Sequence, residues 1–166
     1  LANTAHISIF RADGGEIPNW QAIKSNLEKA ENIKEISPTA FENSFLISEI
    51  ASNYAALRVV SNFKFQVSNS DKINVALGKQ LAEKSNLKIG DEAEIITLEN
   101  ESEPKRTRIL VAEIFETGLF DYDSTWIYIS PENFARLHNK QTFTPPNLSV
   151  SVKDIYKSNE TARAIC

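Results

Sequence analysis

The side chains best suited to chemistry in this chain are two aspartates and two histidines. Asp121 and Asp123 are separated by one residue and are followed by Thr125. Carboxylates can act as nucleophiles or as general acids and bases. His6 and His138 lie far apart in the sequence, and neither has a Cys, His or Asp at the spacing of a metal site. No Ser-His-Asp or Cys-His set can be assembled either, so we expect no bound metal and no cofactor.

The segment Leu119–Thr125 fits the pattern D-x-D-x-T and in this respect resembles haloacid-dehalogenase-like phosphatases. The resemblance implies that Asp121 is a nucleophile that forms an aspartyl phosphate, that Asp123 is the general acid and base, and that Mg²⁺ neutralises charge. That chemistry needs the motif after the first strand of a large parallel α/β sheet, and here little chain follows it. We therefore interpret the segment as an exposed polar turn between two strands, and we expect a chain that is not an enzyme.

Composition and charge narrow the class of protein. Of the 166 residues, 42% are hydrophobic and 24% charged, which excludes a disordered, collagen-like or coiled-coil chain. A formal net charge of -4 provides no basic field for a phosphate backbone, so we expect no nucleic-acid partner. The longest stretch without Asp, Glu, Lys or Arg, Gln141 to Val152, is shorter than the roughly 20 residues of a spanning helix. The start at Leu1, the end at Cys166 and the lack of Met lead us to expect an excised piece of a longer protein.

The first 67 residues predict a β-α-β unit with further strands behind it. Thr4–Arg11 alternates apolar and polar residues as a strand does. A helix then begins near Pro18, and its apolar face carries Trp20, Ile23, Leu27 and Ala30. Extended segments follow at residues 33–40, 41–50 and 53–67.

The middle of the chain predicts mostly strands. After a polar cluster at residues 69–71, strands are expected at residues 73–77, 92–98, 107–115 and 125–129, with a short helix after the first of them. Ser130 and Pro131 predict the cap and first turn of another helix. The charged segment Glu99–Arg106 is expected to be the mobile, solvated tip of a hairpin.

The last part of the chain, like the first, predicts a strand followed by a helix. Leu148, Val150 and Val152 alternate with polar residues, and Asp154 is placed to cap a second helix. Two β-α units that bracket a β-rich middle predict an α+β fold. We expect one discontinuous subdomain of residues 1–67 and 146–166 and an inserted β-rich subdomain of residues 68–145. The first helix should pack on the sheet that both parts of the discontinuous subdomain share.

Four stretches, in their order and spacing, look like the extracytoplasmic domain of ABC-transporter permeases of the lipoprotein-releasing LolC/LolE type, within the MacB-like family. They span most of the chain and are A-H-I-S-I-F near the start, Val75–Ile96 (V-A-L-G-K-Q-L-A-E-K-S-N-L-K-I-G-D-E-A-E-I-I), Thr107–Ser130 and Leu148–Tyr156. The resemblance implies a "porter" part built from β-α-β units and an inserted "sabre" part. It also implies a place outside the cytoplasmic membrane, between the first two membrane helices of a permease in the inner membrane.

The same resemblance implies a function without chemistry. ATP hydrolysis at cytoplasmic subunits would move this domain and the second permease subunit, extract lipoproteins and pass them to a periplasmic carrier. In the carrier-recruiting subunit a hairpin grips the carrier, and the partner-binding candidates at the matching place are Glu99, Asn100, Glu101, Ser102, Glu103, Pro104, Lys105 and Arg106. MacB-like domains that serve efflux of drugs or peptides and FtsX-like domains that control cell-wall hydrolases remain alternatives, and the subunit type stays open.

Overall fold

The computed structural model describes residues 7–61, 63–65, 69–99, 103–153 and 158–165 of a mixed α+β chain. The chain divides into two compact units, Leu1–Ala40 with Thr144–Cys166 (unit 1) and Phe41–Phe143 (unit 2). His6 and Cys166 lie outside the described residues, and so does the predicted helix cap at Asp154.

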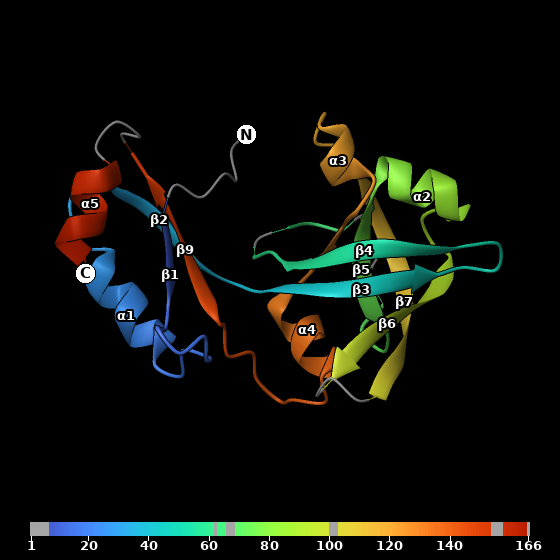
Figure 1. Cartoon of the computed structure of the whole chain (residues 1–166), viewed down its shortest axis with the longest axis horizontal. Coiled ribbons are helices and arrows are strands. Elements are labelled where there is room, and N and C mark those ends of the chain that lie inside the picture. The colour runs from blue at the N-terminus through green and yellow to red at the C-terminus, as the bar shows by residue number, and fades with distance from the viewer. Residues whose placement is uncertain (1–6, 62, 66–68, 100–102, 154–157, 166) are drawn as a thin grey trace. The chain divides into compact units, whose positions relative to one another are not determined.

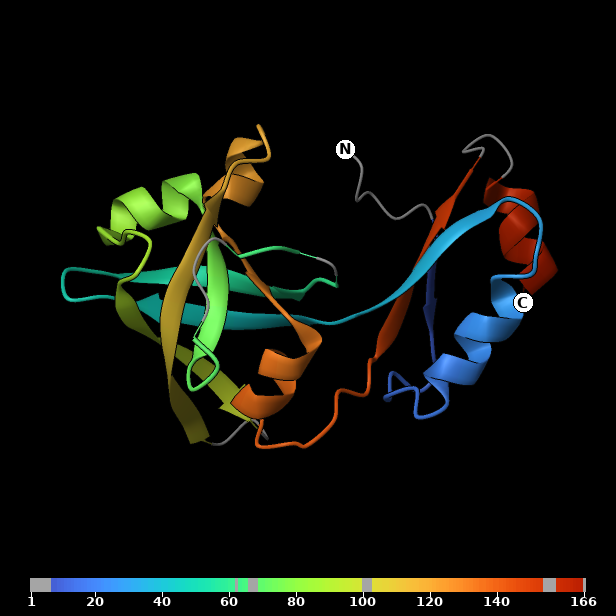
Figure 2. The same cartoon turned by 180° about the vertical axis from the view of Figure 1, so that it is seen from behind.

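Unit 1 contains a three-stranded antiparallel sheet in the order β1-β9-β2, formed by β1 (Ile7–Phe10), β9 (Asn147–Val152) and β2 (Ile33–Thr39). The central residue Val150 pairs with Ile7 on one side and with Ile36 on the other. Figures 1 and 2 show both helices of the unit, α1 (Trp20–Leu27) and α5 (Ser158–Ile165), on the same side of this sheet. Strands distant in sequence thus form one surface for the helices to cover.

The core of unit 1 confirms that the first helix packs on this sheet. Its buried members are Ile17, Ile33, Ile36, Leu148, Val150 and Val152, and the α1 side chains Trp20, Ile23 and Leu27 pack against them. After α1 the chain reverses at Asn32, whose φ of 67° is one that Asn tolerates better than most residues. The Asn32 side-chain nitrogen donates a hydrogen bond of 3.1 Å to the Thr161 hydroxyl and so links this turn to α5.

Unit 2 contains six strands that close into a barrel in the order β3-β4-β8-β5-β7-β6. They are β3 (Phe41–Ile47), β4 (Ser52–Val59), β5 (Ile73–Gly78), β6 (Glu92–Glu99), β7 (Glu103–Phe115) and β8 (Trp126–Ile129). Two strand pairs are parallel, β4 with β8 and β5 with β7, and the others are antiparallel. Alternate residues point inward and fill the barrel with fully buried side chains, among them Leu46, Leu57, Val75, Leu77, Ile95, Ile109 and Ile127.

The boundary between the units differs from the one expected after residue 67, because the structure divides the chain after Ala40. Strand β3 pairs with β6 and closes the barrel, and β4 pairs with β8, so both strands belong to unit 2. The predicted strand at residues 53–67 also ends earlier, at Val59. Beyond it, the ring of Phe63 meets the rings of Tyr128 and Phe115 edge to face, with centroids 5.4 and 6.4 Å away.

The helices of unit 2 are short: α2 (Lys79–Ser85), α3 (Phe120–Asp123) and α4 (Pro131–Leu137). The expected cap of α4 is confirmed, since the Ser130 hydroxyl accepts a hydrogen bond of 3.2 Å from the backbone nitrogen of Asn133 and Pro131 opens the helix. Within the described residues, no helix combines the length and the apolar character needed to cross a membrane.

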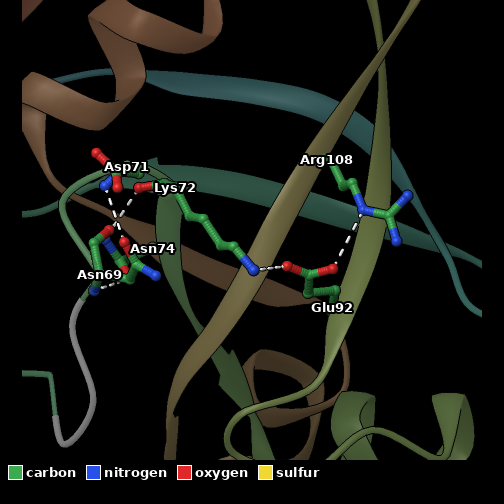
Figure 3. Close-up of polar contacts among 6 residues, drawn as sticks. All are labelled: Asn69, Asp71, Lys72, Asn74, Glu92 and Arg108. Carbon is green, nitrogen blue, oxygen red and sulfur yellow. Dashed lines mark hydrogen bonds and ion pairs between the residues drawn. The ribbon is translucent and has the colours of Figure 1, made fainter.

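The polar turn before β5 is held by the side chain of Asn74. Its nitrogen donates to the carbonyl oxygens of Asn69 (2.9 Å) and Lys72 (3.1 Å), and its oxygen accepts from the backbone nitrogen of Asn69 at 3.1 Å. The Asn69 side-chain oxygen in turn accepts from the backbone nitrogen of Asp71 (Figure 3). The polar cluster read from the sequence is therefore a hydrogen-bonded turn that leads the chain into the barrel.

Ion pairs join neighbouring strands on the outside of the barrel. Glu92 on β6 contacts the Lys72 ammonium with one carboxylate oxygen and Arg108 on β7 with the other, at 3.3 Å from the Arg108 Nε (Figure 3). Glu94 pairs with Arg106 on the same two strands, at 2.8 Å. These ion pairs link β6 to β7 and to the turn before β5.

Candidate functional site

The hairpin of β6 and β7 is longer than the sequence suggested. Its ladder continues until Glu99 pairs with Glu103, so the expected loop Glu99–Arg106 is strand at both of its ends. Asn100, Glu101 and Ser102 lie outside the described residues, and the expected mobility of the tip falls on them. The expectation of a long solvated loop was wrong for the rest, because charged residues can continue a ladder when their backbones pair.

Lys105 and Arg106 both have partners inside unit 2. The Lys105 ammonium donates a hydrogen bond of 2.6 Å to the carbonyl oxygen of Leu137, at the C-terminal end of α4, where unpaired carbonyls attract a cation. Arg106 pairs with Glu94. Lys105 therefore joins the hairpin to α4, and Arg106 joins the two strands of the hairpin to each other.

An apolar side chain next to the tip is exposed, which the sequence did not reveal. Leu98 is 63% exposed and lies opposite Pro104 in the ladder. In the sequence, Leu98 ends an alternating strand and looks like one more core residue. Its position places a small apolar surface at the end of the hairpin.

The two aspartates of the D-x-D-x-T segment differ in environment. Asp121 is exposed, whereas Asp123 is buried at the end of α3. The Asp123 carboxylate accepts hydrogen bonds from the backbone nitrogen and hydroxyl of Thr117, both at 2.7 Å, and from the backbone nitrogen of Gly118 at 3.1 Å. Burial alone would raise the pKa of the Asp123 carboxyl, but these donors outweigh it and hold the pKa below its usual value. The expectation that both aspartates lie in an exposed turn was wrong for Asp123.

The fixed carboxylate organises the turn that leads into α3. Gly118 has a φ of 88°, which favours glycine, and the Thr125 hydroxyl donates to the carbonyl oxygen of Asp121 at 2.6 Å. On the other side, a Cβ at Gly78 would lie 2.3 Å from the carbonyl oxygen of Asp123. Helix α3 thus packs against the junction of β5 and α2 with no room for a side chain between them.

This turn presents apolar side chains to solvent. We call Leu119, Phe120 and Tyr122 the knob; their exposed fractions are 52%, 69% and 39%. Behind the knob, the Tyr122 ring stacks on Trp126 with centroids 3.8 Å apart, and the Arg58 guanidinium lies 4.1 Å from the Trp126 ring centroid. The sequence predicted an exposed polar turn here, and the structure shows that apolar side chains are exposed in it as well.

A groove of about 530 Å³ is lined by α2, by the turn that follows α2 and by the end of β7. Its apolar floor consists of Ala82, Leu87, Ile114 and Phe115. Its charged rim consists of Lys79, Glu83, Lys88 and Glu116. Lys79 and Glu116 form an ion pair of 3.1 Å. The hydrogen bond to the Glu116 carboxylate and the negative charge of that carboxylate raise the pKa of the Lys79 ammonium. Such a groove can hold apolar side chains and orient them with charges.

His138 also has a partner in unit 2. Its Nε2 lies 2.6 Å from a carboxylate oxygen of Glu42, and its ring meets Phe134 edge to face at 4.7 Å. The described residues contain no group of three or more His, Cys, Asp and Glu side chains that could hold a metal ion. The polar groups picked out by the sequence thus lie at separate places, Asp123 under α3, His138 at the end of α4 and Arg106 on the barrel wall.

Comparison with known proteins identifies solved structures with a similar fold. No protein-family model matches the chain, and no curated protein sequence matches it. The crystal structure of the periplasmic region of MacB from Actinobacillus actinomycetemcomitans is similar, with a TM-score of 0.57 and 13% identity over 95% of this chain and 79% of that one. The extracellular domain of the noncanonic ABC-type transporter YknZ from Gram-positive bacteria is similar too, with a TM-score of 0.57 and 12% identity over 87% of this chain and 81% of that one. The chain therefore shares the fold of these two transporter domains.

Proposed function

We propose that this chain is the extracytoplasmic domain of an ABC transporter permease and acts by binding and by rigid-body motion. The observation that carries the proposal is the fold likeness to the periplasmic region of MacB, which extends over 95% of the chain. The likeness to the extracellular domain of YknZ supports the same placement outside the cytoplasmic membrane. In the full-length protein, ATPase subunits on the cytoplasmic side and a second permease subunit are its partners.

The substrate we propose is a lipoprotein, which the permease releases from the cytoplasmic membrane and hands to a periplasmic carrier. Support comes from the four stretches that resemble lipoprotein-releasing permeases, above all Val75–Ile96 and Thr107–Ser130. The test uses the full-length permease with its ATPase in lipoprotein-loaded liposomes. ATP should transfer lipoprotein to added soluble carrier, and a permease that lacks residues 1–166 should not. If the intact permease transfers none, lipoprotein release is the wrong substrate assignment.

An efflux permease is the second candidate, because the MacB-like family that the four stretches resemble also includes domains that serve efflux of drugs or peptides. Depletion of the protein in cells separates the two functions. Loss of lipoprotein release leaves lipoproteins in the inner membrane, whereas loss of efflux raises sensitivity to drugs or peptides and leaves lipoproteins in place. Raised sensitivity with lipoproteins still in place would show that the substrate is a small molecule or peptide and not a lipoprotein.

We place the carrier contact at the end of the β6–β7 hairpin. Leu98 and Pro104 supply apolar surface there, and the exposed Glu103 supplies charge that steers association more than it adds affinity. The proposed contact also includes residues 99–102. Lys105 positions the hairpin through its hydrogen bond to Leu137, and Arg106 links the two strands of the hairpin through Glu94.

Two matched substitutions test this contact. Leu98→Ser should weaken carrier binding in a pull-down at least about tenfold, because an exposed apolar anchor near a contact centre carries much of the binding energy. Ile50→Ser is the control, since Ile50 is 67% exposed on the β3–β4 turn and Leu98 is 63% exposed. Equal binding by both variants and the wild type would show that the contact lies elsewhere and would indicate that this chain is the lipoprotein-receiving subunit.

We also propose that the domain performs no phosphatase chemistry. A general acid must exchange its proton, and the Asp123 carboxylate is buried and held ionised by three donors. The purified chain should not hydrolyse a generic phosphate ester in the presence of Mg²⁺. Mg²⁺-dependent turnover that disappears in Asp121→Asn would overturn this.

A further inference from the structure

Helix α4 contacts both ends of the segment that forms unit 2. Unit 2 begins at Phe41 and ends at Phe143. Next to its first residue, the Glu42 carboxylate lies 2.6 Å from the Nε2 of His138, which directly follows the last helical residue of α4. Its last residue, Phe143, packs edge to face on Phe134 of α4, with ring centroids 5.7 Å apart. Both places where the chain passes between the units are therefore anchored to one short helix.

The contact between His138 and Glu42 lies where a proton can reach it. The two side chains are 17% and 20% exposed, so both are largely withdrawn from water and neither is enclosed. Partial burial strengthens a charged contact, because water and salt screen it less. The His138 ring also packs edge to face on Phe134, with centroids 4.7 Å apart, which helps to fix its orientation. Histidine is the side chain that ordinarily gains its proton closest to neutral pH.

The negative charge of Glu42 favours the protonated form of the His138 ring. A neutral imidazole can donate one hydrogen bond from Nε2 to the carboxylate, whereas an imidazolium makes the same bond with the attraction of opposite charges added. Charge-assisted hydrogen bonds are roughly twice as strong as neutral ones. The contact should therefore tighten when the ring gains a proton and weaken when the ring loses it.

Other charged side chains of the described residues modify this effect. Lys105 on β7 opposes protonation of the ring, since its ammonium binds the carbonyl oxygen of Leu137, the residue before the histidine. The Arg136 guanidinium binds carbonyl oxygens in the turn before β5. Glu132 at the start of α4 and Lys140 after its end are exposed, so solvent and salt screen their charges. The β3 carboxylate touches the ring directly and so has the largest effect among these groups.

We propose that the contact between His138 and Glu42 is a pH-dependent switch: protonation of His138 holds the two connections between the units firmly on α4, and loss of the proton loosens them. When the contact opens, the first residues of β3 and the segment after α4 lose a fixed point that they share, while the ladder of the barrel stays paired. The flexibility of both connections then depends on pH. The inference rests on contacts within unit 2 and not on the proposed transport function.

An NMR titration of the His138 ring between about pH 5 and about pH 8.5 tests the effect of charge. The ring should take up its proton at a higher pH in the wild type than in Glu42→Gln, which keeps a hydrogen-bond acceptor but removes the charge. Glu132→Gln is the matched control, because it removes one charge from the exposed start of the same helix and should leave the titration unchanged. The same titration in the wild type and in Glu42→Gln would contradict the proposal.

Amide hydrogen exchange tests the effect on the segment after α4. The backbone nitrogens of Asn139 and Lys140 donate to carbonyl oxygens of α4 at 3.1 and 2.8 Å, so their protection reports whether this segment is closed. After correction for the intrinsic pH dependence of exchange, this protection should rise about threefold to tenfold in the wild type from about pH 8 to about pH 5.5. The amide of Gly90, which donates at 2.8 Å in the turn before β6, is the reference and should change less than about twofold.

Two variants separate the switch from general effects of pH. His138→Gln keeps a polar side chain that cannot gain a charge, and Glu42→Gln removes the carboxylate. In both, the protection of Asn139 and Lys140 should stay within about twofold over the same pH range, with near-ultraviolet circular dichroism confirming the fold. A pH dependence that persists in full in the folded variants would overturn the proposal. Protection that does not change with pH in the wild type would overturn it without any substitution.

Discussion

The Asp123 carboxylate receives two hydrogen bonds from the same residue, one from the backbone nitrogen of Thr117 and one from its hydroxyl, both at 2.7 Å. Helix α3 has only four residues and cannot be stable through its own backbone hydrogen bonds. A buried anion six positions along the chain from Thr117 thus sets the conformation of the turn. The exposed knob has a defined position because of this internal contact.

Asp123→Ala should lower the free energy of unfolding by about 1 to 3 kcal/mol, because it removes the charge-assisted hydrogen bonds that the Asp123 carboxylate accepts from Thr117 and Gly118. Asp121→Ala should change it by less than about 0.5 kcal/mol, since Asp121 is exposed. Urea denaturation at pH 7 measures both. Equal effects of the two substitutions would show that the Asp123 contact does not hold the turn.

The Asp123 contact should also depend on pH. Its pKa is lowered in the folded chain, so the stabilisation is complete above the unfolded-state pKa of about 3.9 and is lost as the pH falls through the lower folded-state value. The difference in unfolding free energy between the wild type and Asp123→Asn should therefore be largest near pH 7 and shrink below about pH 4. A difference that stays constant from pH 7 to pH 3 would contradict an ionised Asp123.

Gly78→Ala should destabilise the chain by about 1 to 3 kcal/mol. The new Cβ would lie 2.3 Å from the carbonyl oxygen and 2.7 Å from the carbonyl carbon of Asp123, so backbone must move. Gly15→Ala is the control, because its nearest neighbour is the end of the flexible Asp13 side chain at 3.2 Å. Thermal unfolding of both variants measures the difference, and a Gly78→Ala protein as stable as Gly15→Ala would rule out this tight contact.

The sequence predicted the fold best where one short pattern determines both an element and its burial. The alternation of Leu148, Val150 and Val152 predicted strand β9 and its inward face, and all three are buried. The pattern could not tell which sheet β3 and β4 join, because alternation fixes the faces of a strand and not its neighbours. The pairing of Ser44 on β3 with Thr97 on β6 is a long-range contact that no local pattern encodes.

The candidate site was less predictable because similar side chains have opposite environments. Asp121 and Asp123 look equivalent in D-x-D-x-T, yet only Asp123 has donors from Thr117 and Gly118 within reach. Leu98 and Leu110 both belong to apolar stretches, but the first is 63% exposed and the second 6%. Exposure of this kind follows from tertiary packing, which a single sequence does not specify.

Leu27→Ala should cost about 1 to 2 kcal/mol of stability, less than the 2 to 5 kcal/mol expected for a fully buried leucine. Leu27 packs against the core of unit 1 but is only partly buried. Leu148, at 0% exposure in the same core, should show the full loss when changed to alanine. Urea midpoints of the two variants give the comparison, and an unchanged midpoint for Leu27→Ala would mean that α1 is not docked on this sheet.

Lys105→Met should lower the unfolding free energy by about 1 kcal/mol, whereas Arg106→Ala should change it by less. Methionine keeps the apolar stem of Lys105 but loses the hydrogen bond of 2.6 Å to the Leu137 carbonyl oxygen, which is then left without this donor. The Arg106 side chain is 61% exposed, so solvent and salt screen its pair with Glu94. Urea denaturation at low and at high salt separates the two effects, since only the Arg106 contribution should diminish with salt. If Arg106→Ala were the more damaging change, the hairpin would be held by its outer ion pair rather than by its contact with α4.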